Sequence, residues 1–188
     1  MSKEHFQYLK GLAILAVMVG HIGNFSGKTW FTPLGGIGVA LFLFCSGFGL
    51  TKSYQKNGLK HFWRNKLISV YFPFVVVELI TAVAYKRTAI NVLLELLFIK
   101  MQHPYGWYLQ YLLVCYVLFY LGMRFIEDTR IRYVIWGTVA ASTFVFCSNL
   151  RGEQAISFLA GILLAEYLGD AANMSLSRRH AFAGGGAC

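Results

Sequence analysis

Two ionisable residues lie within the first apolar stretch of the chain, Tyr8 to Phe25: Lys10 near its start and His21 near its end. In a helix, their separation corresponds to about 16 Å along the axis. At about 100° per residue, the two side chains also share one helix face. Ionisable groups inside a bilayer are energetically expensive, so each is a candidate functional residue. The pair predicts a cation near one membrane surface, aligned with an imidazole deeper in the bilayer.

His21 is a candidate general base, because an imidazole titrates near neutral pH and can take the proton of a hydroxyl. Lys10 can hold an anionic group such as a phosphate as a compact point charge. Each residue also has a simpler explanation. A neighbouring helix or interfacial water can satisfy His21, and the Lys10 ammonium can extend to the lipid headgroups. The shared face keeps the catalytic explanation open beside the simpler one.

The composition is that of a membrane protein. Apolar residues make up 57% of the chain and charged residues 13%, and the apolar residues are gathered into long runs. We therefore predict an all-α, multi-pass transmembrane helical bundle of about six crossings, with the shorter stretch Thr88 to Ile99 as an interfacial helix. The six crossings are expected at about Tyr8 to Phe25, Leu34 to Leu50, Leu67 to Tyr85, Tyr108 to Gly122, Ile131 to Cys147 and Ala155 to Leu168.

The distribution of basic residues predicts the topology. The loop from Thr51 to Lys66 carries five Lys or Arg residues and no Asp or Glu, so the positive-inside rule places it in the cytoplasm, together with the N-terminus. If Thr88 to Ile99 does not cross, the later loop with Arg124 and Arg130 is cytoplasmic as well. We expect a multi-pass protein of the cell membrane. Its first segment lacks a small-residue cleavage site, which favours a retained signal anchor.

Arg64 and Lys66 lie immediately before the third apolar span, on the same predicted side as Lys10. Three cations could therefore converge on one anion at the cytoplasmic mouth. Anchoring to lipid phosphates explains the charges of Arg64 and Lys66 equally well. The formal net charge of +9 fits anionic headgroups or an anionic cofactor better than nucleic acid, because the charge accompanies long apolar runs.

Several remaining features are predicted to be structural. The four cysteines show no CxxC pair and no metal-ligand spacing, so we expect free packing thiols and no metal. Among the acidic residues, Glu78 has the mid-span position that best suits a side chain facing the protein interior. A pair between Glu78 and a cation, or between Glu78 and His21, is the less favoured explanation of this residue. Residues 170–188 have the composition of a basic, low-complexity tail, predicted to be disordered. Residues 1–169 form the predicted membrane domain.

An ordered set of short motifs resembles the acyltransferase 3 family of membrane-bound acyltransferases, which act on glycans and related acceptors. The resemblance covers about residues 5 to 169. The motifs, in order, are the basic residue and His of Tyr8 to His21, Ser46-Gly47-Phe48 at the end of the second span, the basic element Phe62 to Lys66 leading to Pro73, Trp107-Tyr-Leu-Gln-Tyr-Leu-Leu, and Ile156 to Tyr167.

This resemblance implies transfer of an acyl group, commonly acetyl from acetyl-CoA, to a hydroxyl of a carbohydrate or another cell-surface acceptor. It implies that His21 is catalytic and that Lys10, Arg64 and Lys66 hold the phosphates of the acyl-CoA donor. Lys replaces the usual Arg at positions 10 and 66, which keeps the charge but loses the bidentate fork.

Members of the family have more crossings than the six expected here, so we predict an N-terminal portion of such an enzyme. The alternative is a non-catalytic membrane module. Such a module would be a transport or flipping component, or an inactive truncated acyltransferase.

Overall fold

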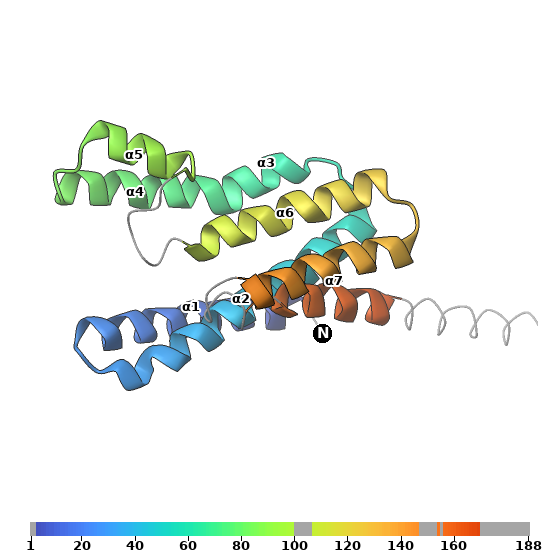
Figure 1. Cartoon of the computed structure of the whole chain (residues 1–188), viewed down its shortest axis with the longest axis horizontal. Coiled ribbons are helices and arrows are strands. Elements are labelled where there is room, and N and C mark those ends of the chain that lie inside the picture. Colours follow the sequence, from blue (N-terminus) through green and yellow to red (C-terminus); the bar gives the residue numbers. More distant parts are fainter. Residues whose placement is uncertain (1–2, 100–106, 147–153, 155, 170–188) are drawn as a thin grey trace, which may run out of the picture. The chain divides into compact units, whose positions relative to one another are not determined.

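The computed structural model of the chain describes residues 3–99, 107–146, 154 and 156–169. Every regular element in these ranges is a helix (Figure 1), which confirms the predicted all-α bundle. The predicted tail, residues 170–188, lies outside the described residues, as do Cys147 and Ala155, which end and begin two predicted spans.

The chain divides into two compact units, one made of Met1–Gly58 with Asp128–Cys188 and the other of Leu59–Glu127. The helices of the first unit are α1 (Lys3–Phe25), α2 (Thr32–Asn57), α7 (Thr129–Phe146) and a short helix, Ile156–Gly169. The helices of the second unit are α3 (Phe62–Lys66), α4 (Phe72–Ala84), α5 (Ala89–Leu96) and α6 (Trp107–Phe125).

Helices α1 and α2 form a hairpin joined by a short 3-10 turn, Thr29–Phe31 (Figure 1). Their backbones approach closely where both helices carry small residues. A Cβ placed on Gly20 would lie 2.7 Å from the Cα of Gly35, and one on Gly38 would lie 2.6 Å from the carbonyl oxygen of Ala13. Small residues allow this contact, as they do between helices in membranes. The hairpin therefore fixes the helix that carries Lys10 and His21.

The second half of α2 packs in the same way on the Ile156–Gly169 helix. A Cβ on Gly47 would lie 2.2 Å from the carbonyl oxygen of Phe158, and one on Gly161 would lie 2.1 Å from that of Phe44. Each glycine thus faces the backbone of the other helix. The glycine of the Ser46-Gly47-Phe48 motif is explained by this packing.

In the second unit, α3 and α4 belong to one continuous helical span, Phe62–Ala84. A π-helical stretch, Leu67–Tyr71, separates them. Pro73, the second residue after this stretch, lies inside the span. Proline lacks the N–H of a regular helical turn and its ring crowds the preceding one, and a local π-helical turn is a common way to accommodate such a break.

Helix α5 folds back along α4 (Figure 1). The Tyr71 hydroxyl donates to the carbonyl oxygen of Leu96 at 3.2 Å, and the rings of Phe74 and Phe98 stack with centroids 5.2 Å apart. The Gln110 side-chain amide donates to the carbonyl oxygen of Phe98 at 2.9 Å, which ties the end of this segment to α6. The predicted interfacial segment, Thr88 to Ile99, is therefore a short helix followed by a turn.

Within the part of the chain that the structure describes, four helical segments are long and apolar enough to cross a membrane: His5–Asn24, Thr32–Asn57, Phe62–Ala84 and Tyr108–Phe125. Their outer surfaces carry large apolar side chains in contact with solvent, such as Leu12, Val77 and Val83, an arrangement suited to lipid. The other two predicted spans are also helical, but one begins with Arg130 and Arg132 and the other is short. The protein is a helical membrane protein, and six crossings remain a prediction.

Candidate active site

Helix α1 carries both Lys10 and His21, and both side chains are half-buried. The residues between them that face α2, Ala13 and Gly20, are fully buried or nearly so. Positions 10, 13, 17, 20 and 21 lie on one side of a helix of 3.6 residues per turn. Lys10 and His21 therefore lie beside the contact between α1 and α2, and not on the outer face of α1.

The surroundings of Lys10 include the Ser46-Gly47-Phe48 motif at the end of the second predicted span. The Lys10 ammonium lies 5.9 Å from the ring centroid of Phe6. The Phe6 ring in turn stacks on Phe48 of the Ser46-Gly47-Phe48 motif, with centroids 4.5 Å apart. A cation over an aromatic face is stabilised by the ring quadrupole. The motif and Lys10 are thus parts of one local structure.

Around His21, both helices of the hairpin are held in place by polar contacts. One turn after His21, Asn24 Oδ1 accepts a hydrogen bond from Thr32 Oγ1 at 2.6 Å. On α2, the other helix of the hairpin, the carbonyl oxygen of Gly36 accepts a hydrogen bond from Gln154 Nε2 at 2.8 Å. Since Gly20 touches Gly35, these contacts order the part of the first unit that contains His21.

Gln154 is a candidate that the sequence did not single out. Its side chain is almost fully buried, and Oε1 has no hydrogen-bond partner among the described residues. A buried, unpaired carbonyl oxygen is costly, so a hydroxyl that donated to it would be stabilised. The available signal was weak: one amide next to an apolar run, far along the chain from Gly36.

Arg64 and Lys66 lie in the second unit, on α3. Arg64 is exposed, whereas Lys66 is half-buried, with its ammonium 4.7 Å from the ring centroid of Tyr116 on α6. Phe62, between the two helices, stacks on Phe119 with centroids 6.3 Å apart. Because Lys10 and His21 belong to the other unit, the convergence of the three cations on one anion stays a prediction.

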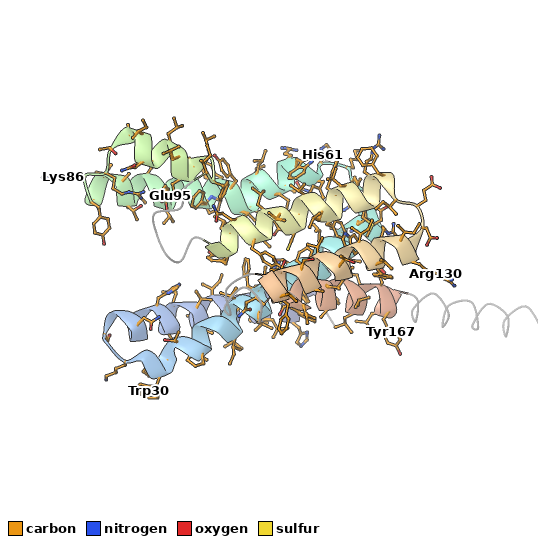
Figure 2. The ribbon with its side chains drawn as sticks, in the orientation of Figure 1. Trp30, His61, Lys86, Glu95, Arg130 and Tyr167 are labelled. Carbon is orange, nitrogen blue, oxygen red and sulfur yellow. The ribbon has the colours of Figure 1, made fainter. Side chains whose placement is uncertain are left out.

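The second unit also contains a buried ion cluster, in which Arg87 pairs with both Glu78 and Glu95. The exposed fraction of each carboxylate is 5% or less. The pKa of Arg87 is raised, and the largest cause is the hydrogen bond between its guanidinium and Glu95. Figure 2 shows Glu95 on α5, and it also shows Lys86, the exposed neighbour of Arg87, at the turn between α4 and α5.

The inward-facing pair of Glu78 with a cation is therefore present, with Arg87 as the cation. The sequence did not identify Arg87 or Glu95 as partners. The cluster joins α5 to α4 and lies in a different unit from His21, so we assign it to the fold and not to the candidate active site.

Comparison with known proteins gave one match. The family model of the acyltransferase 3 family, described as an acyltransferase domain, matches residues 4–184. The comparisons with curated proteins and with solved structures found no match.

Proposed function

Because the chain belongs to the acyltransferase 3 family, we propose that it is an integral membrane O-acyltransferase. It moves an acyl group, in this proposal acetyl, from acyl-CoA to a hydroxyl of a carbohydrate or another acceptor at the cell surface. The observation that carries the proposal is the placement of Lys10 and His21 beside the contact between α1 and α2, in a chain whose family performs acyl transfer.

The proposed chemistry needs one general base. His21 takes the proton of the acceptor hydroxyl as the hydroxyl oxygen attacks the thioester carbonyl carbon. The carbon–sulfur bond then breaks, and the departing thiolate takes the proton from the His21 imidazolium.

The donor is proposed to bind from the cytoplasm. Lys10, Arg64 and Lys66 supply positive charge for its phosphates. His21 lies about three helical turns further along α1 than Lys10. With the N-terminus in the cytoplasm, the donor and an external acceptor would approach from opposite sides of the membrane.

Turnover in reconstituted vesicles tests this function. The purified chain is supplied with acetyl-CoA and, separately, with longer acyl-CoA donors, and release of free CoA thiol is measured with a model carbohydrate acceptor. We expect His21→Ala to lower the rate by about 10²-fold or more, the usual contribution of a general base. His5→Ala, an exposed histidine at the start of the same helix, is the matched control and should keep the rate.

Two results would contradict the proposal. Equal rates for His21→Ala and His5→Ala would remove His21 from the mechanism. An unsubstituted chain that folds in the vesicles but releases no CoA above background would favour the non-catalytic membrane module.

A further inference from the structure

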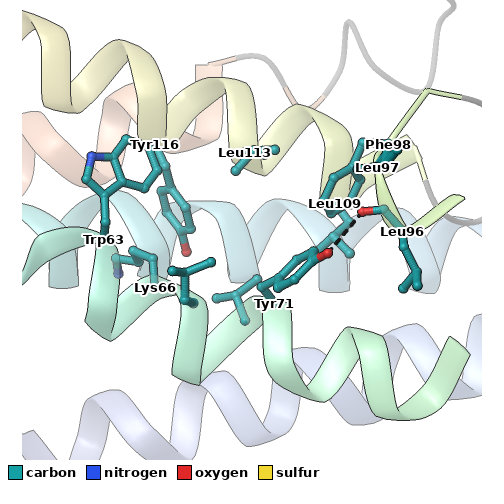
Figure 3. A pocket seen from close by; sticks show the side chains of 11 residues that line it. Trp63, Lys66, Tyr71, Leu96, Leu97, Phe98, Leu109, Leu113 and Tyr116 are labelled. Atoms are coloured by element: carbon teal, nitrogen blue, oxygen red, sulfur yellow. Dashed lines mark hydrogen bonds between the residues drawn. The ribbon is translucent and has the colours of Figure 1, made fainter. Parts of the chain in front are cut away.

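A pocket of about 270 Å³ lies within the Leu59–Glu127 unit, between the Phe62–Ala84 helix and α6 (Figure 3). This volume is near the lower end of the ~300–1,000 Å³ range of ligand pockets. Of the described residues that line it, Lys66 is the one with a charged side chain, and most of the others are aliphatic or aromatic. The pocket therefore combines one cation with a long apolar wall.

The two ends of the pocket differ in chemistry. Figure 3 shows Lys66, Trp63 and Tyr116 at one end, and Leu96 and Leu109 at the other. The Lys66 ammonium lies over the Tyr116 ring, which fixes the position of the charge beside the pocket. A ligand that fits this arrangement has a negative group directly next to an apolar chain.

At the apolar end, two backbone carbonyl groups have hydrogen-bond partners. The carbonyl oxygens of Leu96 and Phe98 accept hydrogen bonds from Tyr71 and Gln110, respectively. With these groups satisfied, what remains for a ligand at this end is aliphatic and aromatic surface. Burying a polar group there would cost free energy, because it would lose hydrogen bonds to water without replacement.

We propose that this pocket is a binding site for an anionic phospholipid of the surrounding bilayer. The lipid phosphate lies at Lys66, and one acyl chain runs along the pocket toward Leu96 and Leu109. In a phospholipid the chains begin a few bonds from the phosphate, which matches a cation placed directly beside an apolar wall. Basic pockets between transmembrane helices bind anionic headgroups in this way.

The acyl-CoA donor matches the same pocket less well. Its phosphates are separated from the acyl group by a long arm that contains amides, and the apolar wall offers these amides no partners. The lipid proposal therefore does not rest on the transfer reaction, although both proposals place a phosphate at Lys66.

Trp63 lines the pocket and provides the probe. In the full chain, the other three tryptophans are replaced by Phe (Trp30→Phe, Trp107→Phe and Trp136→Phe). Quenching of Trp63 fluorescence is then measured with brominated phosphatidylglycerol and with brominated phosphatidylcholine. We expect phosphatidylglycerol to quench at a several-fold lower mole fraction. Lys66→Gln should abolish this preference, and Arg124→Gln, an exposed cation at the end of α6, should keep it.

A second pair of variants tests the apolar wall. Leu113→Phe places a larger side chain in the pocket and should weaken quenching by phosphatidylglycerol, whereas Val117→Phe lies one turn along α6, outside the lining, and should not. Native mass spectrometry of the chain with all its tryptophans, counting bound phosphatidylglycerol, makes the same comparisons if the Phe replacements impair folding.

Equal quenching by the two lipids, or quenching unchanged by both Lys66→Gln and Leu113→Phe, would overturn the proposal and indicate general contact with the bilayer only. No donor or acceptor is present in these measurements. A failure of acyl transfer therefore does not change the lipid-quenching result. Likewise, equal quenching by the two lipids would not contradict the acyltransferase proposal.

Discussion

Arg87 is the charged residue whose removal the fold should tolerate least. Its guanidinium pairs with two carboxylates, Glu78 and Glu95, that are almost completely removed from solvent. Such a cluster adds little net stability when complete, because desolvation opposes the attraction between the charges. When one member is lost, the remaining charge is buried without compensation.

We therefore expect Arg87→Gln to destabilise the protein by about 3–5 kcal/mol, the usual loss on breaking a buried ion pair. Lys86→Gln is the matched control, since Lys86 is adjacent and exposed, and its effect should stay within about 0.5 kcal/mol. Thermal unfolding in detergent, followed by tryptophan fluorescence, measures both. Adding Glu78→Gln and Glu95→Gln to Arg87→Gln should restore part of the lost stability. A midpoint for Arg87→Gln equal to that of Lys86→Gln would show that the cluster is not required.

The sequence identified part of this cluster. A carboxylate in the middle of an apolar span needs a partner, so Glu78 could be expected to face inward. Its partners lie beyond the end of α4 and on α5. The helical periodicity of one segment does not predict which residues it will contact in a segment on the other side of a turn. The contact of Lys66 with Tyr116 was missed for the same reason: it joins two helices far apart in the chain.

Among the elements, α2 is the helix that organises the first unit, because glycines on two of its faces meet two different helices. Gly35 and Gly38 lie against α1, and Gly47 lies against the Ile156–Gly169 helix. Without a hydrophobic force between helices in lipid, such close backbone contact is a main source of association. The motif glycine, Gly47, is thus a packing residue that holds Phe48 near Phe6 and Lys10.

We expect Gly47→Ala to destabilise the first unit by about 1–3 kcal/mol, the cost of overpacking, since the new methyl group would meet a backbone carbonyl that cannot move alone. Gly49→Ala is the control two residues later, where a Cβ would make only ordinary contacts at 3.9 Å. It should be neutral, or more stable by up to about 1 kcal/mol from helix propensity. Thermal unfolding of the two variants in the same detergent distinguishes them, and equal midpoints would refute the glycine contact.

Helix positions were largely predictable, because long apolar runs have few alternatives in a membrane. Irregularities within a helix were less predictable from the sequence. The structure places Pro73 inside the continuous Phe62–Ala84 helix, after a π-helical stretch. The sequence shows the proline, but the wider turn that accommodates it depends on backbone geometry that composition does not specify.

At the scale of the whole molecule, α5 decides the topology. Its eight residues span only about 12 Å at 1.5 Å per residue, against a hydrocarbon core of about 30 Å. It also turns back along α4 instead of continuing away from it. A helix this short does not cross, so the segments before α3 and after α6 should lie on the same side of the membrane.

Cysteine labelling tests this arrangement. In a chain whose native cysteines are replaced, Ser53→Cys and Glu127→Cys are placed at exposed positions before α3 and after α6, and Lys28→Cys at the exposed turn between α1 and α2. With a cytoplasmic N-terminus, a membrane-impermeant maleimide added to intact cells should label Lys28→Cys alone. All three should react after the membrane is opened. Labelling of Glu127→Cys, but not Ser53→Cys, in intact cells would mean that α5 belongs to a crossing segment. The proposed cytoplasmic entry of the donor would survive that result, because Lys10, Arg64 and Lys66 all precede α5.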